Sequence, residues 1–459
     1  MPLPVGISSD GTFADSIDAE TMQQLSAQGA GGGVSHDILK AKGTSADPHF
    51  GLLGGEFDAD HLDKAGWAIM FGTNVSDAIK KNLSPLIELR KKQVGNPALF
   101  KTLDPPAANK SASAWLEDQH NSLNVVDPAK GVPYYVLIVA SPDDISFEFQ
   151  YELDLYWAVG RLWLQKPADF ERYAQSVVDY ETKPGTASRK IVLFAPDFDG
   201  KDNGAGKLVS ANLIQPMIAA GLGQAEKFPL QSFLGKDATK NNLQNIFTAS
   251  EAPALMFTAS HGLLEPAKSD DLPARQGAVL CQDYQGGAAE PDSYYEAADL
   301  PKNAKLRGSV HFLFSCYGVG CPRYDTYNLK RKVTIAPAPM MARLPQELLS
   351  RENGALAVLG HIDRAWSSSY VLDGQPQEQG FRSVLTKLMS GNYRLGSATD
   401  QFNFRWAALS IPLADTLQKM QTKRGLEEQA AHWWVRRDDA RNYILHGDPA
   451  VKLRVGGLA

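Results

Sequence analysis

The chain has 459 residues, 43% of them hydrophobic, so it can bury a large core and should divide into two or three domains. Its 46 Lys and Arg nearly balance its 52 Asp and Glu, and the net charge of -6 argues against nucleic acid or a membrane surface as a partner. The N-terminus lacks the pattern of a secretion signal, and no apolar run approaches the roughly 20 residues that span a bilayer. We therefore expect a cytoplasmic protein whose three cysteines stay reduced.

Residues 1–60 are rich in Gly, Ala, Ser and Asp, a composition that favours a mobile N-terminal tail with little fixed structure. Residues 61–125 follow as an N-terminal α/β extension. Within this extension, the sequence predicts a strand at 66–72 and a helix at 76–93 that Pro85 kinks.

The rest of the chain carries a repeated pattern of short apolar runs that break into small and polar residues. These predicted strands lie within 133–146, 191–195, 254–262, 309–318 and 355–363. Helical stretches separate them, for example at 208–221 and 240–249. This alternation predicts an α/β fold with a mostly parallel sheet covered by helices. In such sheets, ligands bind at the carboxyl ends of the strands.

Two candidate catalytic residues, His261 and Cys316, fall at such strand ends. A cysteine becomes a useful nucleophile when an imidazole lies within hydrogen-bond reach, because the two groups share a proton near neutral pH. Gly262 lets the backbone approach a substrate closely, and the N–H groups of Gly262 and Cys316 could face the oxygen on which negative charge develops. This chemistry requires no cofactor.

Each candidate also has a purely structural interpretation. A cysteine that follows an apolar run is usually part of the packing, and we expect Cys281 and Cys321 to be structural thiols. A zinc site built from the three cysteines and His311 lacks the paired C-x2-C spacing, so no metal is expected.

Several motifs occur in a defined order along the chain. "YYVLIVASPDDIS" is a strand and turn, the stretch 158–181 follows it, a histidine-glycine strand end and a cysteine strand end come next, and "RNYILHGDPAVKLRV" stands near the C-terminus. Over about residues 130–455 this set resembles the caspase and gingipain group of cysteine peptidases. The resemblance implies a caspase-like, mostly parallel sheet flanked by helices, with a first subdomain at 126–188 and a catalytic subdomain at 189–459.

The resemblance implies that Cys316 and His261 form a catalytic dyad. In that family, an acidic residue after the first strand of the catalytic subdomain orients the histidine, and Asp197 in "LFAPDFDG" occupies the matching position. Asp199 competes for this role. A carboxylate there would fix the imidazole tautomer and stabilise its cationic form.

Substrate preference departs from the pattern of gingipains that cleave after basic residues. Those enzymes place an acidic residue in the primary pocket, whereas Lys207 or Leu208 stands at the matching position here. An acid from elsewhere could restore the pocket, and the candidates are Asp143, Asp144 and Asp363. The stretch "GHIDRAWSSSY" is expected to line the substrate groove, with Trp366 as a pocket wall or as a core residue.

A long basic loop at 324–345 lies where caspase-like enzymes are often cut on activation. We expect cleavage near Lys330, Arg331 and Lys332, or near Arg343, to switch the enzyme on. The alternative is a solvated loop that simply covers the site. The N-terminal tail is a second candidate for removal.

The sequence thus predicts an intracellular cysteine endopeptidase that acts on protein or peptide substrates, made as a zymogen. The resemblance also allows a role in bacterial regulated proteolysis or defence. The sequence leaves open whether residues 1–125 regulate the enzyme, bind a regulatory protein partner or simply complete the fold. One alternative is a catalytically silent caspase-like module that serves as a binding partner or scaffold. Another is transfer or hydrolysis of a non-peptide acyl group by the same dyad.

Overall fold

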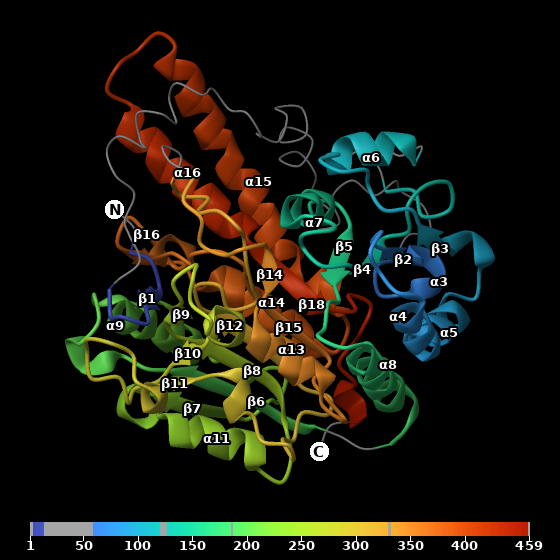
Figure 1. Ribbon diagram of the computed structural model, residues 1–459, viewed down its shortest axis with the longest axis horizontal. Coiled ribbons are helices and arrows are strands. Elements are labelled where there is room, and N and C mark those ends of the chain that lie inside the picture. The colour runs from blue at the N-terminus through green and yellow to red at the C-terminus, as the bar shows by residue number, and fades with distance from the viewer. Residues whose placement is uncertain (1–2, 13–57, 120–125, 185–186, 329–331, 458–459) are drawn as a thin grey trace.

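A ten-stranded sheet forms the centre of the molecule (Figure 1). The computed structural model describes residues 3–12, 58–119, 126–184, 187–328 and 332–457. In spatial order the strands are β3 (Phe100–Leu103), β2 (Trp67–Phe71), β4 (Tyr135–Val139), β5 (Ala158–Arg161), β18 (Tyr443–Gly447), β15 (Ala357–His361), β12 (Val310–Phe314), β8 (Pro253–Ala259), β6 (Ser188–Ala195) and β7 (Leu230–Leu234).

Neighbouring strands of this sheet run parallel except for β15 and β18, which pair antiparallel. The sheet therefore has two halves that point in opposite directions. Strands β8, β12 and β15 end at one edge, whereas β4, β5 and β18 end at the other. This arrangement confirms the predicted α/β class with a large, mostly parallel sheet, and its caspase-like character stays a prediction.

Helices cover both faces of the sheet. The α-helices of the described ranges are α3 (Leu62–Ala65), α4 (Asp77–Asn82), α5 (Ser84–Val94), α6 (Ala112–Asp118), α7 (Phe147–Asp154), α8 (Pro167–Thr182), α9 (Ala205–Val209), α10 (Gln215–Ala219), α11 (Lys240–Thr248), α12 (Leu272–Arg275), α13 (Arg343–Ser350), α14 (Gln379–Ser390), α15 (Leu395–Met420) and α16 (Glu427–Arg441). On β12, Phe312 contacts Phe381 of α14 and Phe402 of α15. Its neighbour His311 contacts Phe247 of α11, because successive strand residues point to opposite faces.

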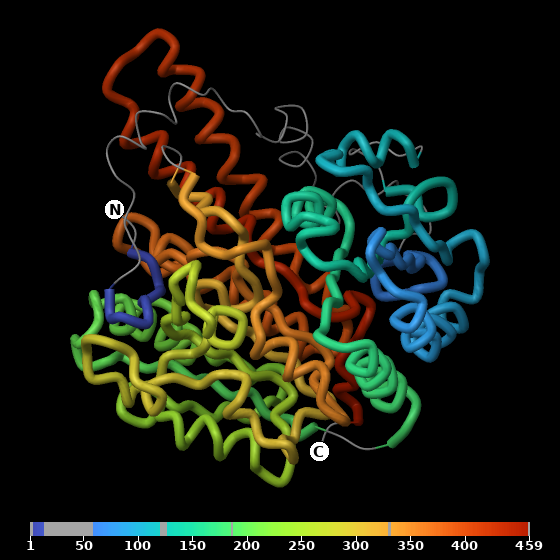
Figure 2. The backbone as a smooth tube through the Cα atoms, in the orientation of Figure 1, coloured from blue at the N-terminus to red at the C-terminus, as the bar shows by residue number. Residues whose placement is uncertain are grey.

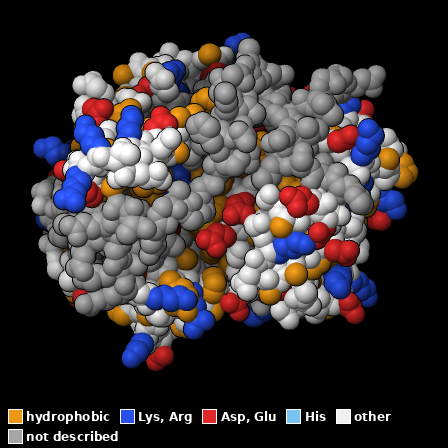
Figure 3. All heavy atoms as spheres, turned by 90° about the horizontal axis from the view of Figure 1, so that it is seen from above, with side chains coloured by type: hydrophobic (Ala, Val, Ile, Leu, Met, Phe, Trp, Pro, Cys, Tyr) orange, Lys and Arg blue, Asp and Glu red, His pale blue; other side chains and the backbone are white. Residues whose placement is uncertain are grey.

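Helices α15 and α16 pack against each other and project from one end of the molecule (Figure 1). None of the helices in the described ranges is long and apolar enough to cross a membrane. On the coloured part of the face in Figure 3, basic and acidic side chains are interspersed, in keeping with the small net charge.

Smaller sheets flank the central one. A four-stranded sheet has the order β1 (Gly6–Ser8), β9 (Gly262–Leu264), β10 (Val279–Leu280) and β11 (Tyr294–Tyr295). Two ribbons pair β13 (Gly320–Cys321) with β14 (Met340–Met341), and β16 (Val371–Leu372) with β17 (Gln375–Pro376). Strand β9 of this sheet begins at Gly262, directly after His261, so the four-stranded sheet adjoins the carboxyl end of β8.

The N-terminal segment differs from the expected mobile tail of residues 1–60. Residues 13–57 lie outside the described ranges, but residues 3–12 are placed, and β1 pairs in parallel with β9. Val5 and Ile7 are fully buried. Figure 2 shows this dark-blue segment against the green and yellow part of the chain. Packing against residues more than 250 positions away gives order that the local composition does not encode.

The predicted helix at 76–93 is divided into α4 and α5, with the break at Leu83. Pro85 stands in the first turn of α5, where its missing N–H has no helical partner to lose. The predicted extension at 61–125 and first subdomain at 126–188 contribute β2, β3, β4 and β5 to one half of the sheet, hydrogen-bonded to one another. All four strands lie in the ten-stranded sheet, and the division into an extension and a first subdomain stays a prediction.

Candidate active site

His261 and Cys316 follow adjacent parallel strands at equivalent positions. Ala259, at the end of β8, pairs with Phe314, at the end of β12, and each candidate residue comes two positions later. Gly262 lies so close to Cys316 that an added Cβ would be 1.9 Å from the Cys316 carbonyl oxygen. Only glycine fits this approach, and it brings the two strand ends together.

A buried carboxylate holds the imidazole of His261. Nε2 of His261 lies 2.8 Å from Oδ2 of Asp202, and both side chains are fully buried. A carboxylate can only accept, so Nε2 carries the proton, and in the neutral ring Nδ1 is left as the base. Nδ1 is buried and has no hydrogen-bond partner among the described residues. The ring also contacts Phe198, with 5.2 Å between ring centroids.

Asp202 is itself fixed by the backbone that follows it. Its carboxylate accepts from the N–H of Gly204 at 3.0 Å and from the N–H of Gly206 at 2.8 Å. Burial acts to raise the pKa of Asp202, but the hydrogen bond and charge of His261, together with these amides, leave the pKa lowered. The group therefore stays ionised at neutral pH.

The structure does not bring Asp197, the predicted orienting residue, to His261. Asp197 accepts from the N–H of Asp199 and caps the short turn after β6. The side chain of Asp199 accepts from Gln282. The signal for Asp202 lies in "DNGAG": glycines two and four residues after an aspartate can turn their amides onto its carboxylate.

The Cys316 thiol is buried and neutral. Its Sγ accepts from the N–H of Ala365 at 3.2 Å. Burial raises the pKa of Cys316 to about 12, and the Ala365 amide offsets only part of that rise. Among the hydrogen bonds of the described residues, none joins this sulfur to His261 Nδ1. The thiol would need a rearrangement before it could transfer its proton to the imidazole.

The two amides predicted to bind a developing oxyanion both donate to one carbonyl oxygen. The N–H of Cys316 lies 3.2 Å from the carbonyl oxygen of Val5, and the N–H of Gly262 lies 3.3 Å from it. The peptide that carries this oxygen belongs to the N-terminal segment. The pair of amides is therefore arranged as an oxyanion hole and is occupied by a peptide carbonyl.

Asp363 and Trp366 lie beside this occupied site. The side chain of Asp363 is buried, where its oxygens accept from the N–H of Arg364 and from the hydroxyl of Thr326. Trp366 is buried against Tyr327, 5.1 Å between ring centroids, and its backbone forms an antiparallel bridge with Pro4.

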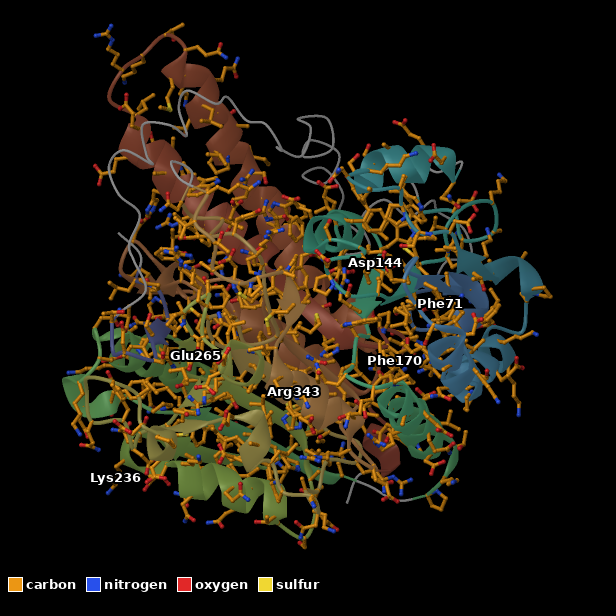
Figure 4. The ribbon with its side chains drawn as sticks, viewed as in Figure 1. Phe71, Asp144, Phe170, Lys236, Glu265 and Arg343 are labelled. Carbon is orange, nitrogen blue, oxygen red and sulfur yellow. The ribbon has the colours of Figure 1, made fainter. Side chains whose placement is uncertain are left out.

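Other predicted pocket residues lie elsewhere. The side chain of Lys207 is exposed on α9. Asp144 follows β4 at the opposite edge of the sheet from Cys316, and its carboxylate accepts from Thr73 and Asn74. Figure 4 shows Asp144 far from Glu265, which comes directly after β9.

The predicted processing loop is described in part. Lys330 and Arg331 lie outside the described residues, and Lys332 is exposed. Arg343 is the first residue of α13 and pairs with Glu347 at 3.1 Å, so cleavage there would require the helix to unwind. The thiols of Cys281 and Cys321 are buried. In the described ranges, no group of three or more His, Cys, Asp or Glu side chains is placed to hold a metal ion.

No family model matches the sequence, and no curated protein matches it. A solved structure described as "Structure of Protease" is similar to 85% of this chain over 78% of its own length, with 14% identity and a TM-score of 0.49. A likeness at this level assigns no activity, so the arguments below depend on the residues of the site.

Proposed function

We propose that the protein is a cysteine endopeptidase of the caspase-like group, with Cys316 as nucleophile, His261 as general acid and base, and Asp202 as the residue that positions His261. One observation carries the proposal. A peptide carbonyl oxygen, that of Val5, accepts from the amides of Cys316 and of Gly262, the residue after His261, and the next residue, Gly6, lies against the thiol. This is the place that a substrate carbonyl must occupy for acyl transfer.

The chemistry follows from the positions of these groups. His261 Nδ1 takes the proton of the Cys316 thiol, and the thiolate attacks the peptide carbonyl carbon, while the oxyanion is held by the two amides. The C–N bond breaks as the imidazolium protonates the leaving amine. Water, deprotonated by His261, then hydrolyses the thioester and restores the thiol. Asp202 keeps Nε2 protonated throughout and stabilises the imidazolium.

The structure has the features of a resting enzyme. The thiol is neutral, Nδ1 has no partner among the described residues, and the N-terminal segment fills the oxyanion hole. These observations support a zymogen, for which we propose a cytoplasmic location, and cleavage near Lys330, Arg331 and Lys332 is the proposed switch. Regulated proteolysis, including a defence role, is the biological setting that such restraint favours.

The test is to incubate the wild-type protein and the Cys316→Ala variant with a denatured proteome and to identify new peptide termini by mass spectrometry. We expect new termini that form only with the wild type. If the intact chain produces none, the comparison is repeated after limited proteolysis of the 324–345 loop. Cys321→Ala is the matched control, because it removes another buried thiol. Identical termini with and without Cys316 would favour the binding or scaffold module.

A further inference from the structure

The N-terminal segment enters the site as an extended strand. Before the bound carbonyl, the N–H of Leu3 donates to Ser367 Oγ at 2.8 Å, and the N–H of Ser367 donates to the Leu3 carbonyl at 2.8 Å. The N–H of Val5 donates to the Ala365 carbonyl at 2.7 Å. Residues 3–5 thus lie antiparallel to 365–367, as a peptide does when it adds a strand to a sheet edge.

The segment continues on the other side of the thiol. Gly6, Ile7 and Ser8 pair in parallel with β9, and the N–H of Ser9 donates to the Leu264 carbonyl at 2.9 Å. The chain therefore changes its partner strand between Val5 and Gly6, directly at Cys316. A bound substrate likewise needs contacts on both sides of the bond that is cut.

From this register we infer that residues 3–9 occupy the groove as a substrate would, with Val5 before and Gly6 after the bond at the reaction centre. The enzyme then prefers an aliphatic residue before the scissile bond and glycine after it, and its own N-terminus blocks other substrates. This inference rests on the proposed peptidase function and names its substrate class.

The side chain of Val5 indicates an apolar primary pocket. It is fully buried and belongs to the main hydrophobic core. The nearest predicted acid, Asp363, has its oxygens engaged by Arg364 and Thr326, so it offers no free carboxylate to a basic residue. A Lys or Arg side chain in the place of the Val5 side chain would be buried without a carboxylate partner, which is costly in free energy.

The position after the bond favours glycine, because any side chain there crowds the Cys316 thiol. A Cβ on Gly6 would lie 2.8 Å from Cys316 Sγ and 2.8 Å from Cδ1 of Leu264. One residue later, Ile7 is fully buried in a small core with Phe198 and Leu263. This side of the groove therefore favours a small residue directly after the scissile bond and a large apolar residue at the next position.

The same contacts explain restraint. While Val5 holds both amides, no second carbonyl can reach them, and the Gly6 backbone covers the sulfur. Hydrolysis of the Val5–Gly6 bond would follow the mechanism above: the amine of Gly6 leaves with a proton from His261, and water gives the carboxylate of Val5. The products are a peptide that ends at Val5 and a chain that begins at Gly6.

The test uses full-length chains in which the segment is displaced. In Gly6→Val the new side chain meets Sγ, whereas in the matched control, Gly456→Val, an added Cβ meets nothing within 4 Å. We expect Gly6→Val to show alkylation of Cys316 by iodoacetamide about tenfold faster than the wild type or the control. Equal rates would overturn the occupancy of the groove. Val5→Arg, which must expel a buried side chain, serves if Gly6→Val does not fold.

The substrate class is tested separately with a synthetic peptide of residues 1–12, MPLPVGISSDGT. The displaced variant should cut this peptide between Val and Gly. It should cut peptides with Arg in place of Val, or with Val in place of Gly, at least about tenfold more slowly. Termini that depend on Cys316 but follow other residues would overturn the specificity and leave the peptidase function standing. No Cys316-dependent cleavage of any peptide or proteome would overturn both.

Discussion

One oxygen of Asp202 accepts two hydrogen bonds at 2.8 Å, one from His261 Nε2 and one from the N–H of Gly206. The carboxylate is therefore held from the backbone side while it holds the imidazole. We propose that Asp202 positions His261, because it contacts Nε2 and leaves Nδ1 without a partner among the described residues.

Asp202→Asn should lower kcat about 10²- to 10⁴-fold with a small change in KM, because an amide can donate to Nε2 and favours the wrong tautomer. Steady-state kinetics on the displaced-segment variant measure this effect. Asp197→Asn is the matched control, since Asp197 caps a turn and does not contact His261. A larger loss in the control than in Asp202→Asn would reverse the two roles.

Asp363 should make folding stability depend on pH. Burial raises its pKa from 3.8 to about 6, although the hydroxyl of Thr326 and the charge and backbone N–H of Arg364 oppose the rise. The folded state thus binds this proton more tightly, so the stabilisation is full below the unfolded pKa and is lost as pH rises through about 6. Relative to Asp363→Asn, the wild-type free energy of unfolding should fall by about 2 kcal/mol between pH of about 4.5 and about 7.

Urea unfolding of both proteins across this pH range measures the difference. Two curves that stay parallel would show that the Asp363 carboxylate does not titrate in this window.

Strands of the central sheet overlap the apolar runs at 254–262, 309–318 and 355–363. Both faces of these strands are buried, so their successive residues are mostly apolar and the strands can be predicted from the sequence. Their carboxyl ends then bring His261 and Cys316 together. The glycines of "DNGAG" mark Asp202 as a carboxylate that backbone amides can hold, but local pattern could not reveal its contact with His261, which joins residues 59 positions apart. Nor could it reveal the order of residues 3–9, whose partners are β9 and 365–367.

Cleavage in the basic stretch is expected to activate the enzyme. Replacing Lys330, Arg331 and Lys332 with Ala should keep the chain intact, as intact-mass spectrometry reports, and should prevent the rise in peptidase rate that accompanies cutting. Arg343→Ala is the control, because Arg343 begins a helix and a peptidase binds an extended chain. A fully active protein that remains uncut would contradict the proposal.

A buried ion pair ties the first half of the sheet to the C-terminal strand motif. Nε of Arg90, on α5, lies 2.6 Å from Oδ2 of Asp448, and its guanidinium contacts Glu181 of α8 at 2.7 Å. Trp67 donates to the other oxygen of Asp448 at 3.0 Å. Arg90 is fully buried, so its removal leaves two carboxylates without their cation.

Arg90→Met should therefore lower the free energy of unfolding by about 3–5 kcal/mol, the usual cost of breaking one side of a buried pair. Lys91→Met is the matched control on the exposed side of the same helix and should change stability by less than about 0.5 kcal/mol. Denaturant unfolding at neutral pH compares them. Asp448 comes directly after β18, so the same substitution should also loosen the pairing of β18 with β5. This should appear as faster amide hydrogen exchange of Leu445 and His446. Equal stability of the two variants would show that Asp448 and Glu181 do not depend on Arg90.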